Sequence, residues 1–256
     1  MENKVEYILG LDISTSVIGM SLFKHENNVL DIVLSESLEL KRKDINKLKG
    51  LEALLLKSKI FEDKLIQYNA IIQMTYKSVI SRVIIETPLV ASNNILTVGV
   101  LMRFSGIITS IVYNTLNVVP EEISSYDARC FGFPQLMEVT VYNKKGEKRD
   151  IKDIKRDLKN GKITLFGGFP FGIDKKNVIF DLLLERYPNI NVLYNKSGEL
   201  KRENFDSTDS MVCVFARLNV EKCGEKPTLV SHEIFPDRIE YKTQWNNIIY
   251  DHTITF

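Results

Sequence analysis

The chain opens with three short apolar runs separated by two polar turns, and this spacing strongly restricts its fold. The first run, Val5 to Leu11, is mostly apolar and β-rich, and Asp12 follows it directly. The second run is Val17 to Phe23, with Gly19 where a side chain would be crowded, and the third is Val29 to Leu34. Runs joined by turns of hairpin length are typical of consecutive antiparallel strands. The opening therefore predicts a three-stranded antiparallel meander with an acid at the exit of its first, buried strand.

Helix and strand patterns then alternate. Apolar residues recur every three or four positions from Asp44 to Lys77, which predicts one or two amphipathic helices. A buried-type strand from Val83 again ends on an acid, Glu86, and Asn93 or Asn94 can cap the long apolar helix that follows. The later elements are expected in the order strand 117–123, helix 124–129, helix 175–187, helix 205–218 and a β-ribbon after 228. This order predicts an α/β fold.

Charge is unevenly distributed along the chain. The 256 residues carry 34 Lys plus Arg and 33 Asp plus Glu, so the formal net charge is only +1. Residues 140–176 nevertheless hold eleven basic and five acidic residues, a net of +6. A uniformly basic nucleic-acid coat and an acidic disordered tail are therefore excluded, and any electrostatic footprint must be local. We expect one domain over 1–219, with a basic, glycine-interrupted insertion at about 134–174, and a C-terminal extension over 220–256.

Four acids flank the predicted buried elements. Asp12 and Glu86 each end an apolar strand, whereas Asp206 and Asp209 lie at i and i+3 near the start of a helix and so share a face. Taken singly, each acid has a simpler role: a turn former or cap at Asp12, a salt bridge at Glu86, and helix N-terminal acids favoured by the dipole at Asp206 and Asp209.

Taken together, these acids favour a divalent metal site. An acid placed directly after an apolar strand is costly unless a cation or hydrogen bonds compensate it. Oxygen ligands favour Mg²⁺ or Mn²⁺, and two such ions about 3.5 to 4 Å apart can activate a water and stabilise the leaving oxygen of a phosphodiester. The pattern therefore points to nuclease chemistry.

Four segments carry a resemblance to a known family. They are ILGLDISTSVIGMSLF, VIIETPLVASNN, VVPEEISSYDAR and DSTDSMVCVFA. In order they show a strand with Asp, a small polar turn and a glycine-containing strand; a strand ending in Glu with Asn before a long helix; a strand followed by Tyr-x-x-Arg; and an Asp-x-x-Asp helix. This succession resembles the RuvC-like Holliday junction resolvases of the ribonuclease H-like superfamily.

The resemblance implies a fold, a site and a partner. The fold is a ribonuclease H-like mixed sheet, a three-stranded antiparallel meander plus parallel strands, flanked by helices. Asp12, Glu86, Asp206 and Asp209 would be the catalytic metal ligands for two Mg²⁺ or Mn²⁺ ions, with Asp12 bridging both. The protein would be a homodimer that cuts strands of opposed polarity in a four-way or otherwise branched DNA junction.

The chain also departs from the bacterial members of that family. Leu89 stands where many of them place an aromatic wedge, the basic insertion is longer, and the tail after Leu218 is extra. These additions, with the richness in Lys, Asn and Ile, resemble viral or phage members more than cellular ones.

The basic insertion has two open interpretations: a solvated, lysine-rich surface excursion or a clamp on the DNA backbone. Phosphate contacts by Lys and Arg supply sequence-independent affinity with a steep salt dependence. The expected DNA contacts are Leu89, Asn93, Arg129, Lys144, Lys145, Lys148, Arg149, Lys152, Lys155, Arg156, Lys159, Lys175 and Lys176.

Other functions remain open at this point. Sugar kinases and actin-like ATPases also begin with strand, Asp, polar turn and strand, although they usually need a longer chain and a later glycine-rich loop. A monomeric, ribonuclease H-like RNA-processing nuclease is the second alternative. Three widely spaced cysteines favour a reducing compartment. Since no apolar run approaches the roughly 18 to 20 residues of a membrane span, we expect a cytoplasmic protein that works with DNA and no membrane.

Overall fold

The structure is a computed structural model that describes residues 5–40, 45, 48, 50–88, 94–136, 147, 149–160, 173–224, 228–245 and 248–255. The chain divides into two compact units. The first comprises Met1–Ala128 with Phe180–Val214, and the second comprises Arg129–Ile179 with Phe215–Phe256. The expected domain boundary at residue 219 stays a prediction.

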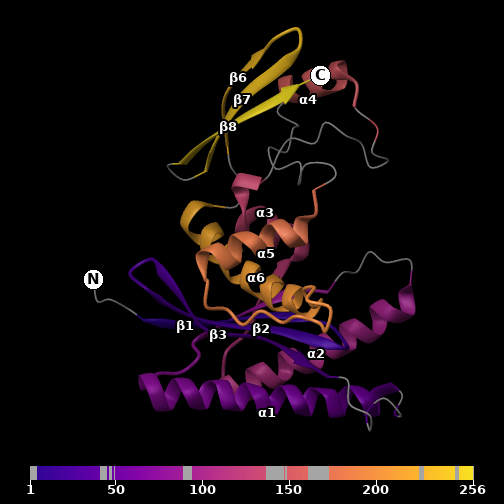
Figure 1. The fold of residues 1–256 in the computed structure, drawn as a ribbon, viewed down its shortest axis with the longest axis vertical. Helices are drawn as coiled ribbons and strands as arrows, with labels where there is room; N and C mark the ends of the chain where they lie inside the picture. The colour runs from indigo at the N-terminus through magenta and orange to yellow at the C-terminus, as the bar shows by residue number, and fades with distance from the viewer. Residues whose placement is uncertain are drawn as a thin grey trace. The chain divides into compact units, whose positions relative to one another are not determined.

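A five-stranded mixed sheet forms the centre of the first unit (Figure 1). Its strands lie side by side in the order β3 (Val29–Glu39), β2 (Val17–Glu26), β1 (Glu6–Ile13), β4 (Arg82–Thr87) and β5 (Glu121–Ser124). Strands β1 to β3 pair antiparallel, β4 pairs parallel to β1, and β5 pairs parallel to β4. The expected meander plus parallel strands is therefore confirmed, and the arrangement is consistent with a ribonuclease H-like sheet.

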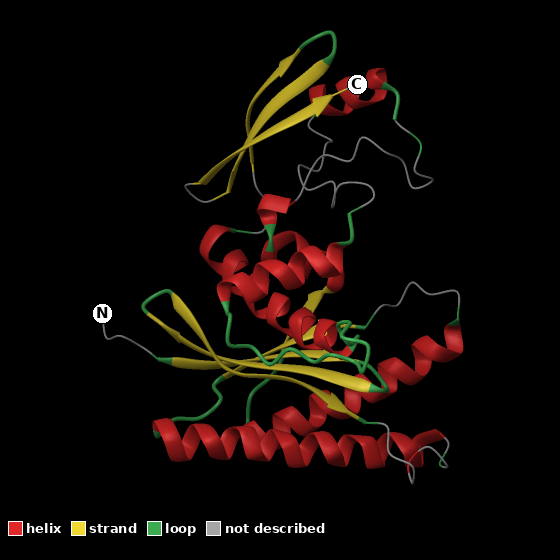
Figure 2. Cartoon of the chain, in the orientation of Figure 1, coloured by secondary structure: helices red, strands yellow, loops and turns green. Residues whose placement is uncertain are grey.

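Two long helices, α1 (Gly50–Tyr76) and α2 (Ile95–Leu116), cover one face of this sheet, as Figure 2 shows. Alternate strand residues such as Leu9 and Leu11 join Phe61 of α1 and Phe104 of α2 in one buried apolar cluster. The segment expected to hold one or two helices forms a single α1 of 27 residues.

The C-terminal cap of α2 explains why the start of the following strand was predicted wrongly. Asn94 caps the start of α2 as expected, because its Oδ1 accepts a hydrogen bond from Thr97 N at 3.2 Å. Asn117 ends the helix with a left-handed φ of 54°, and its N–H donates to Tyr113 O. The strand expected from Asn117 therefore starts only at Glu121.

Helix α2 also corrects the expectation about apolar segments. Among the described residues it is the one helix long and apolar enough to cross a membrane, and only 22% of its apolar stretch is buried. By length and composition alone, then, the chain does contain such a segment. Phe104, Ile108 and Val112 nevertheless lie in the buried cluster under the sheet, so one side of α2 belongs to the core.

Helices α5 (Lys175–Arg186) and α6 (Glu203–Cys223) follow the expected positions in sequence, and α6 is longer at both ends than predicted. Within the first unit they lie over the other face of the sheet (Figure 1). Phe180 of α5 and Phe205 of α6 meet edge to face, with ring centroids 5.9 Å apart. The sheet is thus covered on both faces, which explains why β1 is buried along most of its length.

The second unit includes α4 (Ile151–Lys159) and an antiparallel sheet of β6 (Thr228–Ile234), β7 (Arg238–Trp245) and β8 (Ile248–Thr255). This sheet is the expected C-terminal β-ribbon with three strands. His252 stacks on Tyr241 with ring centroids 4.5 Å apart, and burial lowers the pKa of His252. The short helix α3 (Ser125–Gly132) and the 3-10 turn η2 (Pro134–Leu136) precede the insertion.

Candidate active site

Asp12 and Glu86 lie at the same level of the sheet, at the carboxyl ends of two neighbouring parallel strands. Leu11 of β1 is in register with Ile85 of β4, and the two acids are the next residue on each strand. Neighbouring strands lie about 4.8 Å apart, so the backbones at Asp12 and Glu86 are adjacent. Leu11 and Ile85 are buried with α1 and α2, and side chains alternate between faces. Both acids therefore belong to the face that α6 covers.

Helix α6 approaches this face closely at two glycines. A Cβ atom on Gly19 would overlap the carbonyl group of Asp206, and one on Gly10 would overlap the carbonyl oxygen of Ser210. Gly19 is also the register partner of Asp12 across β1 and β2. The expected crowding at Gly19 is confirmed, and it seats the α6 backbone at Asp206 beside the strand position opposite Asp12.

The two acids of α6 lie on the flank of that helix directed toward β1 and β4. On the opposite flank, Met211 Sδ lies 3.9 Å from Ser35 Oγ of β3. At about 100° per residue, Asp206 and Asp209 fall on the other side of Ser210 from Met211. Because β3 and β4 lie on opposite sides of β1, the acid flank is turned toward β4.

Hydrogen bonds fix the start of α6 relative to the sheet. The buried Asn204 donates through Nδ2 to Leu193 O at 2.7 Å, and its Oδ1 accepts from Leu193 N at 2.8 Å. Ser37 of β3 donates its hydroxyl to the carbonyl of Glu203. Contacts with Leu193 and Ser37 thus fix the position of the α6 start, which carries Asp206 and Asp209 over the strands. Asp209 itself is buried.

The turn after Asp12 is held by its own hydroxyl groups and by a lysine of α1. Ser14 Oγ donates to Val17 O at 2.7 Å and accepts from Val17 N at 3.0 Å. Lys57 Nζ donates to Thr15 O at 2.6 Å. Lys57 was not expected from the sequence, because nothing distinguishes it from the other lysines of an amphipathic helix.

The four carboxylates supply only oxygen donors, the ligand type that suits Mg²⁺ or Mn²⁺. In the part of the chain that the structure describes, no three His, Cys, Asp or Glu side chains are close enough together to hold a metal ion. Register and helix packing bring the backbones of Asp12, Glu86 and Asp206 to one region of the sheet. Their role as metal ligands stays a prediction.

The residues expected to contact DNA are scattered over several elements. Arg129 lies half-buried in the last turn of α3, and Lys175 and Lys176 are exposed at the start of α5. Arg149 precedes α4, which carries four further expected contacts. Those four are Lys152, Lys155, Arg156 and Lys159. Leu89, Asn93, Lys144, Lys145 and Lys148 lie outside the described residues.

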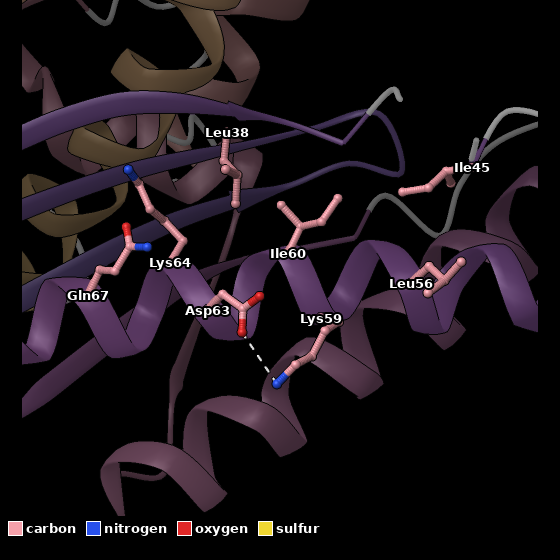
Figure 3. A pocket seen from close by; sticks show the side chains of 8 residues that line it. All are labelled: Leu38, Ile45, Leu56, Lys59, Ile60, Asp63, Lys64 and Gln67. Atoms are coloured by element: carbon pink, nitrogen blue, oxygen red, sulfur yellow. Dashed lines mark ion pairs between the residues drawn. The ribbon is translucent and has the colours of Figure 1, made fainter. Parts of the chain in front are cut away.

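A cavity of about 440 Å³ lies elsewhere, between β3 and α1 (Figure 3). Leu38 and Ile60 line it together with two lysines. Lys59 is ion-paired with Asp63 at 3.3 Å, and Lys64 is ion-paired with Glu36 at 2.7 Å. Because α1 covers the opposite face of the sheet from α6, this cavity is separate from the acids.

Comparisons with known proteins give structural likeness only. The sequence matches no family model, and the search of characterised proteins found no relative. The structure is similar to Thermus thermophilus RuvC in complex with a Holliday junction substrate, at 8% identity and a TM-score of 0.45, over 87% of this chain and 99% of that chain. A second Thermus thermophilus RuvC structure gives 10% identity and a TM-score of 0.42, over 83% and 96% of the two chains.

An Aquifex aeolicus PPX-GPPA enzyme is also similar, at 11% identity and a TM-score of 0.33, over 53% of this chain and 43% of that chain. At these identities and TM-scores, the likeness assigns neither a family nor an activity to this protein.

Proposed function

We propose that the protein is a metal-dependent, structure-selective endonuclease that cuts four-way or otherwise branched DNA. The proposal extends to a RuvC-like resolvase of the ribonuclease H-like superfamily, encoded by a virus or phage and acting in the cytoplasm. Asp12, Glu86, Asp206 and Asp209 would hold two Mg²⁺ or Mn²⁺ ions.

One observation carries this proposal. Asp12 and Glu86 follow the last register pair of two adjacent parallel strands, on the face beneath the acid flank of α6. Each half-buried acid replaces an apolar residue in the alternation of a largely buried strand, a placement that needs hydrogen bonds or a cation to compensate the charge. The carboxyl ends of parallel strands are also where open α/β sheets bind ligands.

The chain's own residues would hold and orient the reacting groups. The bound ions would supply a water nucleophile and stabilise the leaving oxygen of the phosphodiester. Asp12, on β1 between β2 and β4, would be a ligand of these ions. Asp206 and Asp209, fixed by the α6 start, would complete the ligand set from above the sheet.

Amide substitutions test the proposal, because they remove the charge of a carboxylate without changing its shape. We expect Asp12→Asn, Glu86→Gln and Asp209→Asn each to lower cleavage of a four-way junction by orders of magnitude while junction binding survives. The same loss is expected in EDTA. Asp63→Asn is the matched control, since Asp63 is exposed on α1 and should leave cleavage unchanged. Near-normal cleavage by both Asp12→Asn and Glu86→Gln would contradict the nuclease assignment.

The same assay separates the alternatives. Cleavage of structured RNA in preference to branched DNA would favour a ribonuclease H-like RNA-processing enzyme. Thermal stabilisation by magnesium-ATP, without stabilisation by magnesium plus branched DNA, would favour a phosphotransferase.

We further propose a homodimer through the outer side of α2. Ile95 and Leu96 are each 83% exposed there, and Met102 is 52% exposed. A second copy would cover these side chains and would supply a second site for the opposed strand of a junction.

A further inference from the structure

Helix α4 separates its charges by face. At about 100° per residue, Lys152, Lys155, Arg156 and Lys159 fall within an arc of about 100° on a helical projection. Asp153 and Ile154 lie outside this arc. A nine-residue segment of mixed charge thus becomes a helix whose four cations share one face. We call these four residues the α4 basic face.

The α4 basic face is turned to solvent because the helix is anchored from another side. Ile154 is fully buried, whereas Lys152, Arg156 and Lys159 are exposed and Lys155 is half-buried. Asp150 fixes the start of the helix, since its Oδ1 accepts from Lys152 N at 2.8 Å. The orientation of the basic face is therefore set by packing and capping.

The ion pair between Arg156 and Asp153 is exposed and therefore weak. Arg156 Nη2 lies 2.9 Å from Asp153 Oδ1, with side chains 65% and 50% exposed. Exposed pairs of this kind contribute only about 0 to 1 kcal/mol, so a phosphate can replace the carboxylate at little cost.

We infer that the α4 basic face binds the phosphate backbone of DNA. Four cations along one side of a helix complement the regularly spaced charges of a nucleic-acid backbone, and the long Lys and Arg side chains can reach phosphates without base contacts. The inference rests on the proposed function for its choice of DNA, and it assigns the sequence-independent part of the affinity to α4.

An anionic membrane surface is the competing partner for a basic amphipathic helix. Membrane binding of such a helix needs its apolar side free to enter the interface between headgroups and acyl chains. On α4 the central apolar residue, Ile154, is buried within the protein. Among the described side chains of α4, the exposed ones are charged, which favours a polyanion that is contacted through charge.

The test is the salt dependence of DNA binding, measured in EDTA so that cleavage plays no part. A variant with Lys152→Gln, Lys155→Gln, Arg156→Gln and Lys159→Gln should flatten the slope of log affinity against log salt by about 3 to 4 units, for duplex and junction alike. The matched control removes the same charge from exposed lysines elsewhere: Lys59→Gln, Lys77→Gln, Lys196→Gln and Lys222→Gln. It should change the slope by less than one unit.

Each outcome decides the inference. A folded quadruple variant with an unchanged slope overturns it, as does equal flattening in the control, which would indicate bulk charge. If only binding to anionic vesicles falls, the partner is a membrane and the inference is wrong.

Should the quadruple variant fail to fold, the pairs Lys152→Gln with Arg156→Gln and Lys155→Gln with Lys159→Gln should each flatten the slope by about half as much. A flattened slope in a protein that cleaves nothing would support the α4 contact and refute the nuclease.

Discussion

At the scale of single residues, the candidate site depends on a glycine as well as on its acids, because the glycine lets α6 approach the sheet closely. Gly19 faces the α6 backbone at Asp206, so a methyl group there must push helix and sheet apart. We expect Gly19→Ala to lower the free energy of unfolding by about 3 kcal/mol, the upper part of the usual cost of overpacking. Denaturant unfolding would measure this change.

Ser21→Ala is the matched control on the same strand and face. Among the described residues, Ser21 Oγ is the one buried side-chain polar atom without a hydrogen-bond partner. Removing an unsatisfied hydroxyl should leave the free energy of unfolding unchanged or raise it by up to about 1 kcal/mol. Equal destabilisation by both variants would show that the close approach of α6 at Gly19 is not the cause.

Sequence patterns could reveal Asp12, Glu86 and the crowding at Gly19, because each interrupts a buried apolar strand. They could not reveal Lys57. Its hydrogen bond joins α1 to a turn about 40 residues earlier in the chain, and that contact arises only from the packing of α1 on the sheet. Local periodicity carries no information on which lysine of a helix meets a distant carbonyl group.

At the scale of elements, α1 supports the turn after Asp12 through Lys57. Lys57→Met keeps the aliphatic stem and removes the donor to Thr15 O, so the turn after Asp12 loses a restraint. We expect cleavage to fall by about 10- to 100-fold, because small misplacements of reacting groups have effects of that size. Initial rates at saturating junction would measure the loss.

Lys59→Met is the control for this prediction, because the exposed Lys59 is ion-paired with two acids of its own helix, Glu62 and Asp63. Lys57→Arg should recover part of the activity by restoring a donor. Rates that are equal in Lys57→Met and Lys59→Met would contradict a role for the turn restraint.

Most elements followed from periodicity, and the differences have local causes. The caps at Asn94 and Asn117 bound α2, and the left-handed Asn117 delays the next strand. The tail was expected to form a weak β-ribbon, and three strands pair there because Tyr241 and its neighbours on β7 are partnered on both sides. Pairing partners of this kind are a property of the fold and are not encoded in a single strand.

At the scale of the whole molecule, α2 decides between a monomer, a dimer and a membrane-bound protein. Ile108 lies in the core and has no part in this choice, whereas Met102 and Leu96 are 52% and 83% exposed. One face of α2 is thus committed to the sheet, so the helix cannot leave the fold to cross a bilayer without exposing Phe104 and Val112.

We therefore expect the native protein to sediment as a dimer at micromolar concentration. Met102→Glu with Leu96→Glu should give monomers, because two charges would have to be buried in the interface without partners. Met74→Glu is the matched control, since Met74 is 76% exposed on α1 and should leave the dimer intact. The monomers should nick flexible DNA yet fail to resolve a four-way junction, which requires two sites on strands of opposed polarity. A native monomer would refute the dimer, and native protein recovered only with membranes would assign the exposed side of α2 to lipid.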